Sequence, residues 1–283
     1  GSNAYTGGAI TNYFFQVSHD GFDIALDRFS DFFKAPLFDK TYSEREVKAV
    51  NNEHQKNKLN DGWRGSFVSK QISEPGHPLT MFGTGNQDTL SGDNRPALLD
   101  FYEKYYSASN MKLALISNIP MQNLFGIAKK YFSGIPSREV NVPSMPKVFR
   151  KPLKNKFRLL KVKTIKDIRS LEVDFPTIRL NDYQKSKPAG IISSLIGHEG
   201  KGSLLSKLKE EGLVLSLSAG GGSSHPDINS FGISVSLTPK GLENYERILE
   251  LIFNYIRMIR DHGVDEYTFK ENQTMAQINF DWK

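Results

Sequence analysis

The sequence carries the same succession of predicted elements twice, a strand followed by two helices. Both strands are rich in aromatic and β-branched residues, and the helix after each of them has apolar side chains at helical spacing. The copies occupy residues 13–18, 22–33 and 42–46, and residues 231–238, 242–253 and 267–271, at an offset of about 225 residues. We therefore predict two domains of the same fold that arose by duplication. The alternative is the chance recurrence of a common pattern.

Patterns along the whole chain predict a mixture of helices and strands. Predicted helices cover residues 22–33, 43–72, 95–106, 121–132, 203–211, 242–261 and 265–280, and another helix ends at His198. Predicted strands cover residues 10–18, 111–117, 157–162, 170–175, 213–219 and 231–238. Because the two kinds of element are mixed and joined by hairpin-like connections, the predicted fold class is α+β.

A basic stretch that contains prolines separates the two copies. Four prolines fall between residues 136 and 152, and residues 138–169 hold eleven Lys or Arg but only two acidic residues. This composition is typical of a linker, so the predicted domains are residues 1–144 and 145–283. A nucleic-acid site would add a recognisable motif, which the stretch lacks, so no nucleic-acid partner is predicted.

Composition excludes several other kinds of site. The chain has no cysteine, which rules out disulfides, thiolate zinc sites and a cysteine nucleophile. Hydrophobic residues at 38% and charged residues at 24% are ordinary for a globular protein. No apolar run approaches the roughly 20 residues that a membrane-spanning helix needs, so no membrane partner is predicted.

The predicted helix at residues 43–72 is where chemistry is expected. Its middle, residues 51–62, contains a single aliphatic residue, Leu59, so this part faces either water or a polar cavity. Glu46 and Glu53 lie two helical turns apart and share a face. Two such carboxylates can serve as a metal ligand and its supporting neighbour. Alternatively, Glu46 completes a capping box with Ser43 and Glu53 is only solvated.

Several segments resemble the pitrilysin/insulin-degrading enzyme family of zinc metallopeptidases, whose metal-binding motif is inverted. They include REVKAVNNEHQKN, TNYFFQV, GHPLTMFGTGNQDTL, FYEKYYSASNMKL, TIKDIRSLEVDFP and LIGHEGKGSLLSKLKEEGL. The resemblance covers nearly the whole chain. It implies the later part of the first domain and most of the second domain of a four-domain enzyme, each domain a largely antiparallel sheet packed with helices. AVNNE and KYYSASNMK are most similar to the bacterial pitrilysin-like branch.

The resemblance also implies the metal chemistry. Glu53 corresponds to the third ligand of one Zn²⁺ ion, and Glu46 to the acidic residue that supports it. The family's other two ligands and its general base belong to a His-x-x-Glu-His motif, which this sequence does not contain; its six histidines are isolated. No catalytic residue is therefore expected in the chain, which should neither hold zinc nor be active alone.

Further residues are implied to bind substrate. Asn3, Ala4 and Tyr5 match the family's edge strand, which holds an extended peptide by strand addition; an ordinary strand start is the alternative. Trp63 lines a side-chain pocket or packs in the core. Three glycines resemble a distal site that anchors the substrate's N-terminal end, although a hairpin and a helix start would also explain them: Gly220, Gly221 and Gly241.

The predicted function is therefore part of a zinc metalloendopeptidase that degrades peptides and small unfolded proteins inside a chamber. The expected partners are peptide substrates and the remaining segments of the parent enzyme. A catalytically dead structural or partner subunit of the same fold is the alternative. The compartment stays open, because the bacterial branch implies a periplasmic or secreted protein and the alternative is the cytoplasm. The sequence does not determine the oligomeric state.

The repeat makes one further prediction. Aligning Tyr42 on Tyr267 carries Glu53 onto Ile278, so a carboxylate in the first copy corresponds to an apolar side chain in the second. A helix that lines a metal site needs polar ligands, whereas a helix that only packs needs apolar residues. We therefore expect the two helices to be equivalent, with Glu53 toward an open cleft and Ile278 buried against its sheet.

Overall fold

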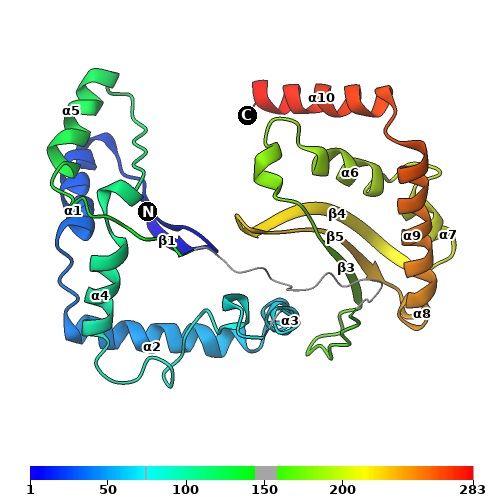
Figure 1. Cartoon of the computed structure of the whole chain (residues 1–283), viewed down its shortest axis with the longest axis horizontal. Coiled ribbons are helices and arrows are strands. Elements are labelled where there is room, and N and C mark those ends of the chain that lie inside the picture. The colour runs from blue at the N-terminus through cyan, green and yellow to red at the C-terminus, as the bar shows by residue number, and fades with distance from the viewer. Residues whose placement is uncertain (74, 144–157, 283) are drawn as a thin grey trace. The chain divides into compact units, whose positions relative to one another are not determined.

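The computed structural model describes residues 1–73, 75–143 and 158–282, which form two compact units (Figure 1). Unit 1 contains Gly1–Tyr5 and Asn12–Ile165, and unit 2 contains Thr6–Thr11 and Lys166–Lys283. The predicted domain boundary, between residues 144 and 145, lies outside the described residues. Helices and paired strands occur together along the chain, which confirms the predicted α+β class.

The N-terminal part of the chain consists of a strand hairpin and a set of helices. Its elements are β1 (Ser2–Thr6), β2 (Thr11–Phe15), α1 (Phe22–Lys34), α2 (Lys40–Asn57), α3 (Asp61–Lys70), α4 (Arg95–Tyr105) and α5 (Met121–Phe132). α1 packs against α5, and the rings of Phe29 and Phe132 meet edge to face between them. The helices predicted at residues 22–33, 95–106 and 121–132 are confirmed.

The single long helix predicted at residues 43–72 is wrong, because the structure has two helices there. Asp39 caps α2 by accepting hydrogen bonds from the backbone N–H groups of Thr41 and Tyr42, so the helix begins before Ser43 and the capping box does not form. Asn60 interrupts the helix: its backbone is extended, and its side chain accepts from the N–H of Trp63 to begin α3. A side chain that caps a new helix favours a break over continuation.

Two predicted strands are absent from the described residues. Residues 111–117 and 158–162 form no ladder with any strand that the structure describes. A strand is stabilised by its pairing with a neighbour, so an alternating pattern alone does not produce one. The described part of the chain provides these two segments with no such neighbour.

Unit 2 is built around a three-stranded antiparallel sheet in the order β3-β5-β4. Its elements are β3 (Ser170–Pro176), α6 (Pro188–Ile196), α7 (Leu204–Glu210), β4 (Val214–His225), β5 (Ile228–Leu237), α8 (Pro239–Glu243), α9 (Tyr245–His262) and α10 (Glu266–Asp281). α6 and α7 pack against β4, and α9 packs against α7. The buried core joins alternate strand residues such as Ile233 and Val235 to Leu208, Ile248 and Ile252 of the helices.

Between its buried apolar residues, the sheet carries small and polar side chains. The register pairs Glu172 with Ser234 and Asp174 with Gly232, and Gly232 also pairs with Gly220. Partial burial raises the pKa of the Asp174 carboxyl above its ordinary value. Successive side chains of a strand point to opposite faces, which explains why β5 has serine or glycine between its buried apolar residues.

The expected burial of Ile278 against the sheet is wrong. α10 packs against α6, and the side chain of Ile278 remains 47% exposed. The main contact of α10 in the described structure is thus with another helix, which leaves this side chain about half exposed. Whether α2 and α10 superimpose stays a prediction.

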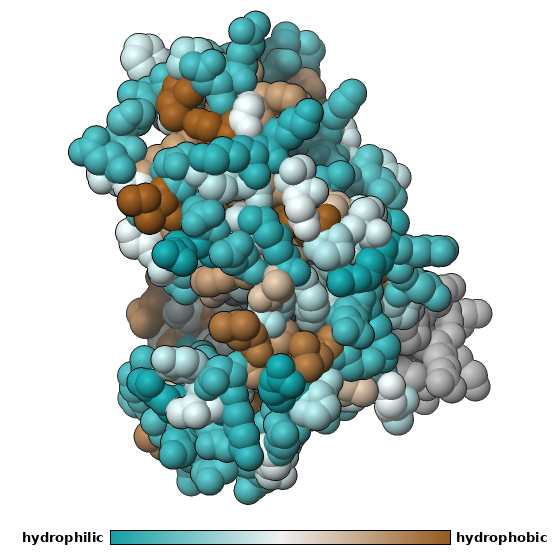
Figure 2. Space-filling view, turned by 90° about the vertical axis from the view of Figure 1, so that its left-hand side faces the viewer, coloured by the Kyte–Doolittle hydropathy of each residue, from teal (hydrophilic) through white to brown (hydrophobic). Residues whose placement is uncertain are grey.

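Hydrophobic side chains are exposed on unit 1. Figure 2 shows several of them among hydrophilic residues on the face that it displays. Phe32 of α1 and Met121 and Phe125 of α5 are each more than half exposed. None of the helices in the described ranges combines the length and the apolar character needed to cross a membrane.

Candidate metal-binding face of α2

The two carboxylates singled out by the sequence lie on α2, and both are exposed to solvent. Their spacing of seven residues places Glu46 and Glu53 on one side of the helix, about 20° apart around its axis. Within the described part of the chain, neither side chain forms a hydrogen bond or an ion pair. Both carboxylates therefore keep free oxygen lone pairs, as a metal ligand requires.

Other sides of α2 contact the loop around residues 82–87. Asn51 Oδ1 accepts a hydrogen bond of 3.2 Å from the N–H of Gln87. The ring of His54 meets the ring of Phe82 edge to face, with 4.7 Å between centroids. These contacts attach α2 to the loop. His54 packs against Phe82 of the loop, whereas the neighbouring Glu53 side chain is exposed and unpaired among the described residues.

Asn57 of this helix is not among the site residues predicted from the sequence. It follows Glu53 by one turn, and its Nδ2 atom is buried without a hydrogen-bond partner. Buried donors are nearly always paired in proteins, so an orphan one marks a place where an acceptor is missing. The four-residue spacing from Glu53 is the signal available in the sequence, but spacing does not reveal burial.

A groove of about 630 Å³ lies on the side of α2 that carries Asn51. It is formed by the first turns of the helix, including Ser43, Glu44 and Lys48, together with residues 87, 88 and 90–94. Glu44 is nine residues from Glu53 and therefore about half a turn away around the helix, so the groove does not include the candidate metal face.

The chain offers one carboxylate whose chemistry suits a zinc ligand. Carboxylate oxygen is a zinc donor, so Glu53, exposed and unpaired, fits the role of one ligand. A catalytic zinc ion takes three protein ligands, however, and the described residues contain no cluster of three His, Cys, Asp or Glu side chains that could hold a metal. The remaining ligands of such a site would have to come from outside these residues.

The residues expected to hold substrate beside the metal lie in β1 and α3. Asn3, Ala4 and Tyr5 are exposed in β1, which pairs with β2 in a two-stranded sheet. Because each strand of this sheet is bonded on one side only within the described chain, the other edge of β1 is open to an added strand. Trp63 is 52% exposed, so core packing is not observed among the described residues.

The three glycines of the expected distal site have different surroundings. Gly220 and Gly221 lie in β4, which is an edge strand of its sheet. A Cβ atom on Gly221 would lie 2.8 Å from Ala189 Cβ, so this glycine is needed for packing against α6. Gly241 is buried, and a Cβ atom there would lie 1.9 Å from the carbonyl oxygen of Leu213. Packing therefore accounts for Gly221 and Gly241.

Two family models match the sequence. The model of the Peptidase M16 inactive domain matches residues 94–275, and the model of Insulinase (Peptidase family M16) matches residues 1–76. The first of these matches covers more than half of the chain. Together they span regions of both structural units.

Individual proteins of this kind are similar over the whole chain. The chain is 40% identical to the insulin-degrading enzymes of Drosophila melanogaster and Homo sapiens, over 100% of its own length and 29% and 28% of theirs. The crystal structure of pitrilysin aligns with a TM-score of 0.86 and 32% identity, covering 99% of this chain and 30% of that one. The chain thus spans less than a third of these relatives.

Proposed function

Because the chain belongs to peptidase family M16, the insulinase and pitrilysin family, we propose that it is part of a zinc metalloendopeptidase to which it contributes Glu53 as a metal ligand. The observation that carries the proposal is the exposed, unpaired Glu53 carboxylate on a polar face of α2. Such a carboxylate has no existing contact to give up, so it is available to a cation that the rest of the parent protein helps to bind.

The residues of this chain would act on the metal and not on the substrate's scissile bond. When bound, zinc supplies a polarised water molecule for attack on a peptide carbonyl. Glu53 would occupy one coordination position, and Glu46 would support the site from two turns away. The two other ligands and the general base would come from a His-x-x-Glu-His segment elsewhere in the parent protein, since this sequence contains none.

The open strand edges support a role in holding peptides. An extended peptide can add to the free edge of β1 through backbone hydrogen bonds, which tolerate many sequences. The edge strand β4 offers a second such place in unit 2. We propose that peptides and small unfolded proteins are held in this way inside a chamber completed by the rest of the parent enzyme.

Exposed apolar side chains support the expected partners within the same parent protein. Phe32, Met121 and Phe125 present large apolar side chains to solvent on α1 and α5. Extensive exposed apolar surface is typical of faces that pack against further protein. We propose that the remaining segments of the parent enzyme cover it.

A catalytically dead subunit is the second candidate, and one observation favours it. The family model that matches residues 94–275 is described as that of an inactive domain. Sequencing the whole gene separates the two candidates. The enzyme requires the motif in the parent protein, whereas a parent protein without the motif would support the dead subunit.

Metal content tests the enzyme proposal directly. In the full-length protein, Glu53→Gln keeps the size of the side chain but removes the charge that balances zinc. We expect the bound zinc, measured by mass spectrometry of the metal, and peptide cleavage to fall together. Glu44→Gln is the matched control, because Glu44 lies on the opposite side of α2. Full zinc occupancy in Glu53→Gln would overturn the proposal.

A further inference from the structure

The buried amide of Asn57 is the starting observation. In the part of the chain that the structure describes, its Nδ2 atom is the one buried side-chain nitrogen or oxygen without a hydrogen-bond partner. A buried N–H that lacks an acceptor destabilises the state in which it is unpaired. The fold therefore contains a buried donor that is still available to form a hydrogen bond.

The position of Asn57 limits which acceptor of this chain can reach it. Because the atom is buried, bulk solvent does not serve it, so its acceptor is either an ordered water or a neighbouring group of the protein. α2 ends at Asn57, and in an α-helix the side chains four residues apart are neighbours. The neighbour one turn before Asn57 is Glu53.

The acidic residue four positions after Asn57 is already engaged. Asp61 begins α3, and its Oδ1 atom accepts a hydrogen bond of 2.8 Å from the N–H of Ile165 and lies 3.8 Å from Arg64 Nε. Glu53, by contrast, is exposed and forms neither a hydrogen bond nor an ion pair in the described chain. A donor without an acceptor and a carboxylate without a donor thus lie one turn apart on the same helix face.

We propose that Asn57 is a positioning residue for Glu53, with its Nδ2–H donating to the Glu53 carboxylate. The inference rests on the proposed function, in which Glu53 is a ligand. A carboxylate that binds a metal is oriented by hydrogen bonds from its neighbours. Asn57 would supply that donor from the same helix, one turn after Glu53.

The proposal predicts different effects in the metal-bound and the metal-free protein. With zinc bound, removal of the amide deprives Glu53 of its donor and weakens metal binding. Without zinc, removal of the same amide takes away a buried donor that has no acceptor, so the fold is not destabilised. A residue with a purely structural role would instead lower the stability of the metal-free protein.

Zinc affinity tests the first half. In the full-length protein, Asn57→Leu, which has nearly the same shape without the donor, should weaken zinc binding by about 10- to 100-fold in a competition with a chromogenic chelator, the usual loss for a group that supports a ligand. Asn52→Leu is the matched control and should keep the parental affinity, because Asn52 is exposed on the same helix.

Thermal unfolding of the metal-stripped full-length protein tests the second half. The midpoint for Asn57→Leu should stay unchanged or rise. A clear fall in this midpoint would overturn the proposal by assigning Asn57 a structural role in the absence of metal.

The affinity result also separates this inference from the proposed function. If Glu53→Gln abolishes zinc binding while Asn57→Leu retains the parental affinity, the positioning role is refuted and the proposed function stands. If Glu53→Gln itself retains zinc, both fall, because no metal-bound carboxylate remains to be positioned.

Discussion

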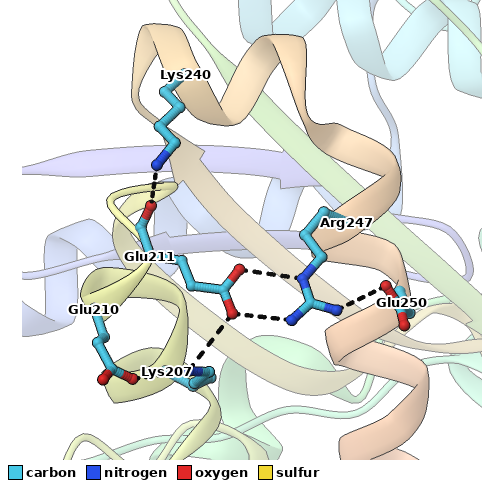
Figure 3. A network of polar contacts seen from close by, with 6 residues as sticks. All are labelled: Lys207, Glu210, Glu211, Lys240, Arg247 and Glu250. Carbon is cyan, nitrogen blue, oxygen red and sulfur yellow. Dashed lines mark hydrogen bonds and ion pairs between the residues drawn. The ribbon is translucent and has the colours of Figure 1, made fainter.

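Arg247 of α9 binds Glu211 at the end of α7 through two parallel hydrogen bonds (Figure 3). Nε of Arg247 lies 3.1 Å from Glu211 Oε2, and Nη2 lies 3.0 Å from Oε1. The same guanidinium donates to Glu250, and Lys240 Nζ donates to the backbone oxygen of Glu211. This network ties together helices that surround the core of unit 2, and the planar fork of arginine is what makes the paired geometry possible.

The first prediction concerns Glu211→Gln. Hydrogen bonds from Arg247 hold the pKa of the Glu211 carboxyl below its ordinary value of 4.5. A carboxyl group with a lowered pKa stabilises the fold above its unfolded-state pKa, and this contribution disappears as the pH falls through the folded-state pKa. We expect the variant to unfold at a lower temperature than the parent at pH 7, with a difference that vanishes in acid.

The matched control for Glu211 is Asp261→Asn. Asp261 pairs with Arg260 on the exposed side of α9, where an isolated ion pair contributes little. The thermal unfolding midpoint of Asp261→Asn should stay near the parental value both at pH 7 and in acid. A difference for Glu211→Gln that persisted unchanged in acid would show that the ion pair is not its cause.

The second prediction concerns Gly241→Ala. The added Cβ would lie 1.9 Å from the carbonyl oxygen of Leu213, which also accepts a hydrogen bond from the N–H of Thr238 and so cannot easily move aside. Overpacking of this kind costs about 3 kcal/mol. Denaturant unfolding should show this loss, whereas Gly222→Ala, where a Cβ meets nothing within 4 Å, should not.

The third prediction concerns Tyr102→Phe. The hydroxyl of Tyr102 lies 2.8 Å from the carbonyl oxygens of both Phe33 and Lys34, and its single proton is shared between them. These carbonyls end α1, just before the connection to α2. We expect a loss of about 1 kcal/mol in the free energy of unfolding, measured with denaturant. Tyr42→Phe is the control, because the Tyr42 side chain is largely exposed.

The helices are the part of the fold that the sequence predicts best. α5 occupies Met121–Phe132, the range predicted for it, because its apolar residues recur with helical spacing on one face. The break between α2 and α3 is not predictable in the same way, since Asn60 fits equally well as a polar surface residue and as a cap. Local patterns identify a helix but place its ends less well.

The ends of the strands depend on pairing with residues that are distant in the sequence. β4 is expected to end near residue 219, but it continues to His225 because Gly220 and Gly222 pair with Gly232 and Ser230 of β5. For the same reason, the candidate site is only partly predictable. The spacing of Glu46 and Glu53 is visible in the sequence, whereas the burial of the Asn57 amide depends on neighbours that the helix pattern does not specify.

The fourth prediction concerns the isolated chain. The described residues contain no cluster of three side chains that could hold a metal, and the sequence has no His-x-x-Glu-His motif. We expect the purified 283-residue chain to bind no stoichiometric zinc and to leave a quenched fluorogenic peptide intact. Cleavage that a chelator abolishes, in a preparation of verified mass, would show that the ligands have been assigned to the wrong residues.

The last prediction compares the two carboxylates of α2 in the full-length protein. Glu46 and Glu53 are both exposed and unpaired in the described chain, so the structure alone does not rank them. A lost ligand removes a metal bond, whereas a lost supporting residue typically costs about 10- to 100-fold in affinity or activity. Glu53→Gln should therefore abolish zinc retention during dialysis against a chelator, while Glu46→Gln should retain zinc with reduced affinity. If Glu46→Gln abolished zinc retention and Glu53→Gln only reduced the affinity, Glu46 would be the metal ligand and Glu53 the supporting residue.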